Sequence, residues 1–145
     1  MKGNPYNQVV LTQLAIIFSF LVFAFTTECS ETCSKTCVAR ECDSVGIRYG
    51  KYCGIGYTGC PREVPCDDVD ACCKLHDDCV RTGGMTNAKC SRKLRNCLAR
   101  ALKSGKVGFS KDCPYRTVVP LMSKAMDAAI ILNSVESVLK NIFGP

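Results

Sequence analysis

Cysteine constrains this chain more than any other residue, because 13 of its 145 residues are cysteines. They are Cys29, Cys33, Cys37, Cys42, Cys53, Cys60, Cys66, Cys72, Cys73, Cys79, Cys90, Cys97 and Cys113. This density indicates disulfide bonds in an oxidising compartment or metal binding in a reducing one. Zinc is disfavoured, because the sequence has no Cys-x-x-Cys unit and its single histidine, His76, has no partner at ligand spacing. We therefore expect a disulfide framework.

The N-terminal segment predicts the oxidising compartment that disulfides need. Lys2 opens a short polar stretch, residues 14–25 are almost wholly apolar, and small residues follow. This layout predicts a cleaved signal peptide over residues 1–29, and hence a secreted, extracellular protein. The alternative is an uncleaved anchor, which fits poorly because a membrane span needs about 20 apolar residues.

Two cleavage positions fit the small residues, one after Thr26 and one after Cys29. Cysteine parity favours the second, because removal of Cys29 leaves twelve cysteines, an even number. We therefore expect residues 30–145 to form one small monomeric domain with six disulfide bonds. A chain of this size cannot fill a large core, so the cross-links must supply much of its stability.

Periodicity and capping signals predict two long helices in a mainly α domain. The first should run over residues 67–81, from an acidic start to the glycines that follow it. The second should run over residues 88–103, capped by Thr86 or Asn87. Both carry cysteines along one face, so we expect them to pack antiparallel and to be joined by disulfides.

The remaining segments are assigned from composition. Residues 34–41 could form a short helix, and residues 49–65 should be loop because four glycines interrupt them. Residues 118–143 are amphipathic and mostly apolar. This pattern is typical of a helix that packs on the domain or faces a membrane.

The single imidazole lies beside a carboxylate, in Asp70-Ala-Cys-Cys-Lys-Leu-His-Asp77. Neighbouring side chains diverge by about 100° on a helix, so His76 and Asp77 can border one site together. Upstream, the loop of residues 49–59 is rich in glycine and can turn several backbone carbonyls inward. Carbonyl and carboxylate oxygens are the ligands that calcium prefers. The pattern suggests calcium-assisted hydrolysis in which the imidazole activates a water.

Each motif also has an ordinary structural interpretation. A glycine-rich loop between cysteines is usually a tight disulfide-bound turn, and a His-Asp pair on a helix is more often a surface feature. Their occurrence together at a specific spacing favours a functional site. The sequence contains no nucleophile elbow, phosphate-binding loop or EF-hand pattern that would suggest another chemistry.

Both motifs resemble those of secreted phospholipase A2. Residues 49–59 match Tyr-Gly-x-Tyr-Cys-Gly-x-Gly-x-x-Gly of its calcium loop, and residues 70–77 match Asp-x-Cys-Cys-x-x-His-Asp of its active-site helix. The longer string over residues 48–73 resembles the plant low-molecular-weight branch, and the resemblance extends roughly over residues 33–145. It implies a small disulfide-rich fold with two antiparallel long helices, a glycine-rich calcium loop and an amphipathic C-terminal helix.

The resemblance also implies roles for individual residues. His76 would be the general base that activates water for attack on the sn-2 ester. Asp77 would be the bidentate calcium ligand, and the N–H of Gly54 would help to stabilise the oxyanion. The protein ligands of calcium would be completed by backbone carbonyls of the loop, from Tyr52, Gly54 and either Gly56 or Tyr57. The third carbonyl stays open because Tyr57 stands where a second glycine is common in animal enzymes.

Two further implications concern cysteines and the orientation of the imidazole. The resemblance pairs Cys53 with Cys73 and Cys79 with Cys97. Animal enzymes orient the histidine with an aspartate that follows a cysteine on the second long helix. This chain has leucine or serine at such positions. Ser91, Asn96 or a water could take that role, or the site could do without it.

The formal net charge is +6, and cations are concentrated between residues 89 and 111. They are Lys89, Arg92, Lys93, Arg95, Arg100, Lys103, Lys106 and Lys111. This pattern is typical either of a solvated helix face or of attraction to anionic lipid headgroups. Nucleic acid is not expected to bind a secreted, disulfide-rich domain without interleaved aromatic residues.

Two functions fit these observations. The first is calcium-dependent hydrolysis of the sn-2 ester of glycerophospholipids by an enzyme that acts at a membrane surface. The second is a membrane- or receptor-binding module on the same scaffold without turnover. An inert module would be expected to have lost His76 or Asp77, and both are present. We therefore expect the enzyme.

Overall fold

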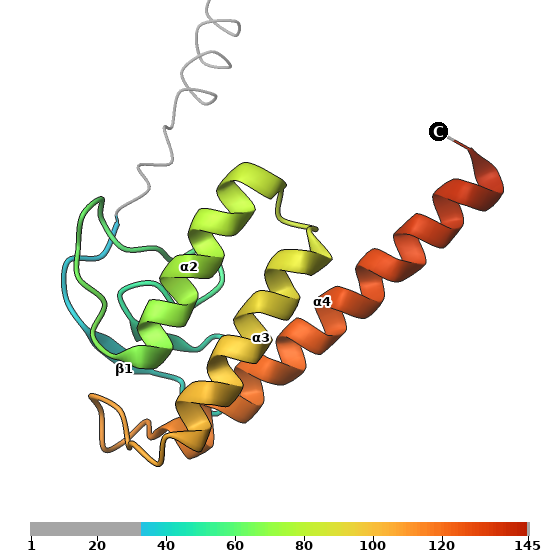
Figure 1. The fold of residues 1–145 in the computed structure, drawn as a ribbon. Helices are drawn as coiled ribbons and strands as arrows, with labels where there is room; N and C mark the ends of the chain where they lie inside the picture. Colours follow the sequence, from blue (N-terminus) through green and yellow to red (C-terminus); the bar gives the residue numbers. More distant parts are fainter. Residues whose placement is uncertain (1–32, 145) are drawn as a thin grey trace, which may run out of the picture. The chain divides into compact units, whose positions relative to one another are not determined.

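The computed structural model describes residues 33–144, and the predicted signal peptide and its cleavage site lie outside them. Along the chain the elements are β1 (Val38–Arg40), β2 (Arg48–Gly50), α2 (Asp68–Gly83), α3 (Ala88–Lys103) and α4 (Tyr115–Phe143). Figure 1 shows the three helices side by side, with the strands and loops of the first third of the domain to the left of and behind α2. The prediction of a mainly α, disulfide-rich domain is confirmed.

The two strands form a small antiparallel sheet in which Val38 pairs with Gly50 and Arg40 with Arg48. The expected helix over residues 34–41 is therefore wrong. Disulfides from Cys33 and Cys37 to Cys60 and Cys66 hold this segment against the loop that follows β2, so its backbone hydrogen bonds go to other segments. The predicted loop over residues 49–65 begins two residues later than expected, because its first two residues belong to β2.

The two long helices are confirmed close to their predicted bounds. Asp67 caps α2 through its side chain, which accepts a hydrogen bond from the N–H of Asp70, and the helix ends before Gly84 at a φ of 85°. Asn87 caps α3 by accepting from the N–H of Lys89. A short turn joins the helices, so they run antiparallel (Figure 1).

All twelve cysteines of the described residues are paired, in six disulfides. The bond between Cys53 and Cys73 is confirmed. The pairing of Cys79 with Cys97 is wrong: Cys79 bonds to Cys90, and Cys72 bonds to Cys97. Cys79 and Cys90 lie close to the connecting turn, on opposite sides of it. Cys72 and Cys97 lie two helical turns further from it, so antiparallel packing brings each pair together.

The third helix, α4, begins three residues before the predicted start, after Pro114. Its first turns are buried at Tyr115, Val118, Val119 and Met122, and the helix packs against α3. These residues join one core with Tyr49, Tyr52, Val69, Leu94 and Leu98 from the strand, loop and other helices. The core therefore joins α2, α3 and the first turns of α4 to the strand and the loop.

Candidate active site

The imidazole of His76 lies on α2 and is partly buried between α2 and α3. Its Nε2 atom is buried and has no hydrogen-bond partner among residues 33–144. Burial lowers the pKa of His76 below its usual value, because the charged imidazolium loses solvation. At neutral pH the ring is therefore uncharged and can accept a proton.

The carboxylate of Asp77 lies one residue further along α2 and connects the helix to the glycine-rich loop. The hydroxyl of Thr58 donates a hydrogen bond of 2.9 Å to Oδ2 of Asp77. Burial raises the pKa of Asp77 to about 6, although the Thr58 hydrogen bond acts in the opposite direction. A partly buried carboxylate with a raised pKa is a group that a cation would stabilise.

The glycine-rich loop is joined to α2 one turn before Asp77, by the Cys53–Cys73 disulfide. Gly54 and Gly56 follow that bond, with φ angles of +151° and +63° that favour glycine. A Cβ at Gly54 would also lie 2.8 Å from the carbonyl oxygen of Ile47, whereas one at Gly56 would meet nothing within 4 Å. The loop is therefore tightly packed at Gly54 and open at Gly56.

The four candidate carbonyls differ in their hydrogen bonds. The carbonyl of Gly54 accepts from the N–H of Tyr57 at 3.3 Å. No backbone N–H or side chain of the described residues donates to the carbonyls of Tyr52, Gly56 or Tyr57. The Tyr57 side chain is fixed, because its hydroxyl donates to Ser34 at 2.7 Å and Arg48 lies over its ring. Both alternatives for the third carbonyl stay open.

The start of the loop is held by Asp70, a residue whose role the sequence did not indicate. Its carboxylate is fully buried and accepts hydrogen bonds from the N–H groups of Lys51, Tyr52 and Cys66, at 2.8 to 3.0 Å. Three amide donors compensate this buried charge and fix the backbone just before the Cys53 disulfide. The spacing places Asp70 on the same side of the helix as Cys73 and Asp77, but it does not indicate which groups the carboxylate contacts.

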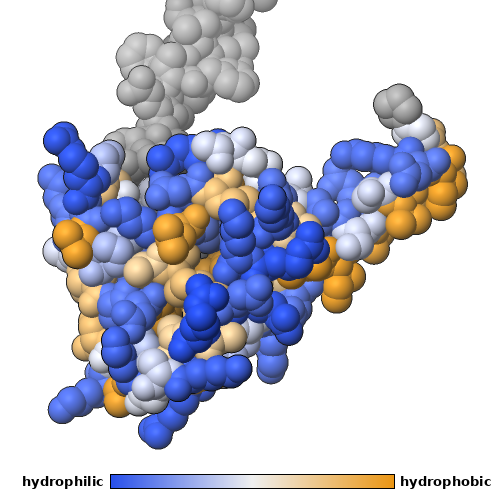
Figure 2. Space-filling view, viewed as in Figure 1, coloured by the Kyte–Doolittle hydropathy of each residue, from blue (hydrophilic) through white to orange (hydrophobic). Residues whose placement is uncertain are grey.

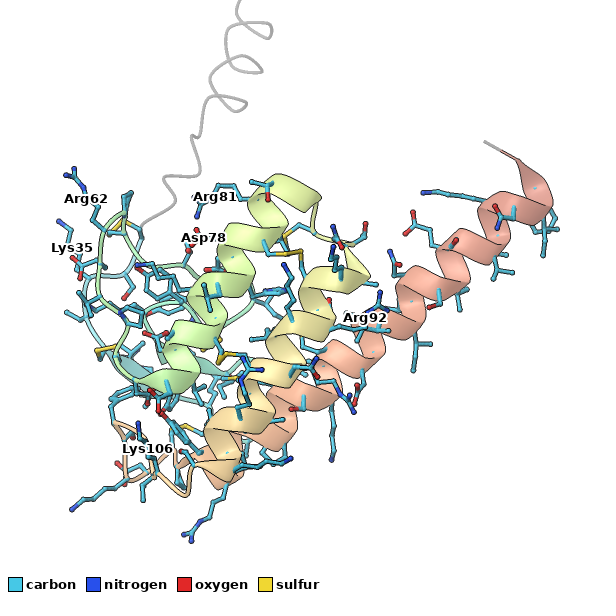
Figure 3. The ribbon with its side chains drawn as sticks, in the orientation of Figure 1. Lys35, Arg62, Asp78, Arg81, Arg92 and Lys106 are labelled. Atoms are coloured by element: carbon cyan, nitrogen blue, oxygen red, sulfur yellow. A yellow bond between two sulfur atoms is a disulfide. The ribbon has the colours of Figure 1, made fainter. Side chains whose placement is uncertain are left out.

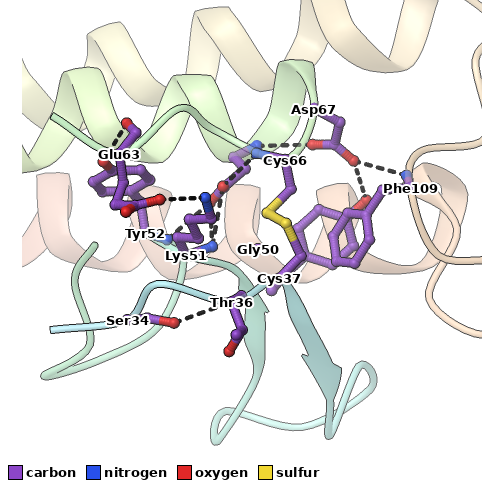
Figure 4. Close-up of a disulfide and its surroundings, with 12 residues drawn as sticks. Ser34, Thr36, Cys37, Gly50, Lys51, Tyr52, Glu63, Cys66, Asp67 and Phe109 are labelled. Atoms are coloured by element: carbon purple, nitrogen blue, oxygen red, sulfur yellow. Dashed lines mark hydrogen bonds and ion pairs between the residues drawn. A yellow bond between two sulfur atoms is a disulfide. The ribbon is translucent and has the colours of Figure 1, made fainter. Parts of the chain in front are cut away.

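Two further contacts frame this part of the loop. Lys51 forms a 2.6 Å ion pair with Glu63, and the Tyr52 hydroxyl donates to the Glu63 carbonyl at 2.8 Å. Figure 4 shows these contacts beside Asp67, which accepts from the N–H of Phe109 at 3.0 Å. The first two contacts join the two ends of the loop to each other, and the third joins the start of α2 to the segment before α4.

A pocket of about 390 Å³ opens between α2 and α3 beside His76. It is lined by Cys72, Leu75, His76, Cys79, Lys93, Leu94, Asn96, Cys97 and Arg100. Neither Asp77 nor the glycine-rich loop lines this pocket. His76 therefore borders the pocket between α2 and α3, whereas Asp77 contacts the loop through Thr58. Figure 3 shows the next residue, Asp78, near Arg81, with which it forms an exposed 2.7 Å ion pair.

The candidates for orienting the imidazole lie in different environments. Asn96 lines the pocket with His76, whereas Ser91 is buried on α3 next to the Cys79–Cys90 disulfide. Within residues 33–144, neither side chain is hydrogen-bonded to His76. In the same residues, no group of three His, Cys, Asp or Glu side chains is arranged to hold a metal ion.

Comparison with known proteins gives closely similar relatives. The chain is 48% identical to Phospholipase A2-beta of Arabidopsis thaliana over 132 residues, which cover 87% of this chain and 88% of that one. It is 48% identical over 122 residues to Probable phospholipase A2 homolog 1 of Oryza sativa subsp. japonica, covering 83% and 88%. No protein-family model matches the chain.

Solved structures agree with these relatives. The structure of rice (Oryza sativa) PLA2 superposes with a TM-score of 0.66 at 35% identity, covering 72% of this chain and 88% of that chain. The rice PLA2 complex with octanoic acid gives the same TM-score and identity, and the match covers 72% of this chain and 93% of the rice chain. Because several relatives are this similar across most of both sequences, the protein belongs to the plant branch of the phospholipase A2 family.

Proposed function

We propose that this phospholipase A2 hydrolyses the sn-2 ester of glycerophospholipids in a calcium-dependent reaction, releasing a lysophospholipid and a fatty acid. His76 is the general base, and Asp77 is the calcium-binding carboxylate. The observation that carries the proposal is the junction of α2 with the loop. There the Cys53–Cys73 bond and the Thr58 hydrogen bond hold the loop beside the helix that bears both residues.

The residues at this junction fit calcium. Calcium binds six to eight oxygen atoms and accepts carboxylates, backbone carbonyls and water. Asp77 offers a partly buried carboxylate, and the carbonyls of Tyr52 and Gly56 are free of backbone hydrogen bonds within the described residues. We assign the remaining protein ligands to Gly54 and, as the alternative to Gly56, to Tyr57.

The chain's own residues would perform the proton transfer and hold the ester. The neutral imidazole of His76 would accept a proton from the attacking water and later deliver it to the leaving alcohol oxygen. The N–H of Gly54 would donate a hydrogen bond to the oxyanion. When bound, calcium would polarise the ester carbonyl and offset the negative charge that develops on its oxygen.

Asn96, Ser91 or a water would orient the imidazole, unless the site does without such a partner. Asn96 is favoured by its place in the same pocket as His76. Ser91 is favoured by its burial on α3, where its neighbour Cys90 is bonded to Cys79, one turn of α2 beyond His76. A water bound between either residue and the unpartnered Nε2 atom would serve as well.

We further propose that the protein acts outside the cell as a monomer on phospholipid surfaces. Six disulfides among the described residues support an oxidising compartment. The related rice PLA2 forms a complex with octanoic acid, a fatty acid of the kind that this reaction would release. The alternative of a module without turnover has no observation in its favour, since His76 and Asp77 are both retained.

The test is hydrolysis of phosphatidylcholine labelled separately at its sn-1 and sn-2 acyl chains, by the purified mature protein. We expect release of the sn-2 label only, abolished by a chelator and restored by calcium but not by zinc. Release of the sn-1 label at a similar rate would contradict the positional assignment. Undiminished release in excess chelator would contradict the role of calcium.

A further inference from the structure

The last turns of α4 present an apolar stripe to solvent. Seven large apolar side chains are 48% to 78% exposed there: Ile131, Leu132, Val135, Val138, Leu139, Ile142 and Phe143. At 100° per residue they cover about 140° of the helix circumference. Figure 2 shows the apolar residues along one side of this projecting end and polar residues along the other. We call these residues the α4 stripe.

The α4 stripe extends past the rest of the domain. The ion pair between Arg95 and Asp127 joins α3 to α4 at 2.7 Å, and Asn133 donates a hydrogen bond to the Thr86 carbonyl in the turn between α2 and α3. Beyond Asn133, within the described residues, α4 forms hydrogen bonds and ion pairs only within itself, including the pair of Glu136 with Lys140. Large apolar side chains exposed in water are unfavourable, so this end of α4 is suited to an apolar surface outside the domain.

We propose that the α4 stripe is an interfacial anchor that inserts into the headgroup–acyl boundary of a phospholipid surface. The proposal rests on the proposed function only for the choice of lipid as partner. Charge complementarity between cations on α3 and anionic lipid headgroups supports that choice. Six of the 16 residues of α3 are Lys or Arg and none is acidic, and only Arg95 among them is in an ion pair within residues 33–144. Two of these cations, Lys93 and Arg100, line the pocket beside His76.

The geometry of α4 favours a helix lying on the surface over one that spans it. This is the one helix within residues 33–144 that is long and apolar enough to cross a membrane by composition. However, its first turns are buried in the core at Tyr115, Val118 and Met122. From Asp127 to Phe143 the helix is only about 25 Å long at 1.5 Å per residue. The hydrocarbon core is about 30 Å thick.

A second copy of the chain fits the α4 stripe less well. A dimeric coiled coil uses a narrow seam of two apolar positions per heptad, sustained over about three heptads or more. The α4 stripe is wider than such a seam and spans less than two heptads, from Ile131 to Phe143. A lipid surface accepts a wide stripe and requires no register.

The test compares two matched double variants in the full mature protein. Val135→Asp with Leu139→Asp places two carboxylates on the α4 stripe, and Ser137→Asp with Asn141→Asp places two on its opposite face. Binding is measured by sedimentation with vesicles of diether phosphatidylcholine, which contain no ester to hydrolyse. A second set of vesicles contains diether phosphatidylglycerol as well. Unchanged circular dichroism verifies that both variants fold.

We expect the stripe variant to bind both vesicles about tenfold more weakly or worse, and the control to bind within about twofold of the parent. High salt should weaken binding to the anionic vesicles and leave binding to phosphatidylcholine alone unchanged. Hydrolysis of ester vesicles should fall with binding, whereas hydrolysis of dispersed short-chain phosphatidylcholine should stay unchanged.

Equal binding of the parent and the stripe variant would overturn the proposal, as would an equal loss in the control. A dimer of the parent that only the stripe variant dissociates, seen by sedimentation equilibrium, would assign the α4 stripe to a second copy and would also overturn it. Failure of the proposed function would appear in a different measurement, as an absence of hydrolysis of dispersed substrate by the parent. Binding to diether vesicles would not report it, because that binding needs no catalysis.

Discussion

The domain has two regions that are stabilised in different ways. Residues 33–113 contain all six disulfides, the buried Asp70 carboxylate and both candidate catalytic residues. The end of α4 has no cross-link, and its largest apolar side chains are exposed. Disulfides between its own residues constrain the first region. An active site requires this, because small displacements of catalytic groups cost activity. In our proposal, the second presents its apolar side chains to a partner outside the chain.

The largest effect that would sharpen this comparison is removal of the base. His76→Asn should lower turnover by about 10² to 10⁴ on dispersed and vesicle substrates alike, because the chain has no second histidine. Substitutions in the α4 stripe should lower hydrolysis of the vesicle substrate and leave hydrolysis of the dispersed substrate unchanged. Steady-state hydrolysis of both substrates measures this, and near-normal turnover by His76→Asn would remove this residue from the mechanism.

A smaller effect concerns stability. Asp70→Asn should lower the free energy of unfolding by about 2 to 3 kcal/mol, because an amide cannot accept all the hydrogen bonds that the buried carboxylate receives from backbone N–H groups. Val138→Asn, on the α4 stripe, should change it by less than about 0.5 kcal/mol. Denaturant titration monitored by circular dichroism compares the two. Equal losses would mean that the two regions are not stabilised differently.

The smallest effect concerns pH in the absence of calcium. Burial raises the folded-state pKa of Asp77 to about 6, above its ordinary value of 3.8. Ionised Asp77 therefore costs stability, and the cost grows as pH rises from about 4 to 6. In chelator, Asp77→Asn should raise the Tm above pH 6 and leave it unchanged below pH 4. A lower Tm for the variant above pH 6 would show that the carboxylate is stabilised without a cation.

The sequence predicted the features that depend on local signals. Both long helices were predicted because caps, glycines and apolar periodicity lie within the segments themselves, as at Asn87 and Gly84. Family resemblance supplied the Cys53–Cys73 bond. The strand at Val38–Arg40 was missed because its hydrogen-bond partners and disulfide partners lie elsewhere in the chain.

Features that depend on distant contacts were missed for the same physical reason. The pairing of Cys79 follows from antiparallel packing around a turn, which spacing alone did not decide. The role of Asp70 requires that the backbone of Lys51 and Tyr52 meets α2, which only the folded chain shows. The exposure of the α4 stripe could not be distinguished from burial, because packed and membrane-facing helices have similar compositions.

Calcium binding by isothermal titration calorimetry tests the central claim most directly, on the parent protein, Asp77→Asn and Asp78→Asn. Asp78 is the matched control, because it is the next residue on α2, is exposed, and pairs with Arg81. We expect one calcium per chain in the parent and in Asp78→Asn. Binding should be lost or at least about tenfold weaker in Asp77→Asn, because the carboxylate is the one charged ligand assigned to the ion. Parent-like affinity in Asp77→Asn, or a loss confined to Asp78→Asn, would contradict the calcium site proposed at the junction of the loop and α2.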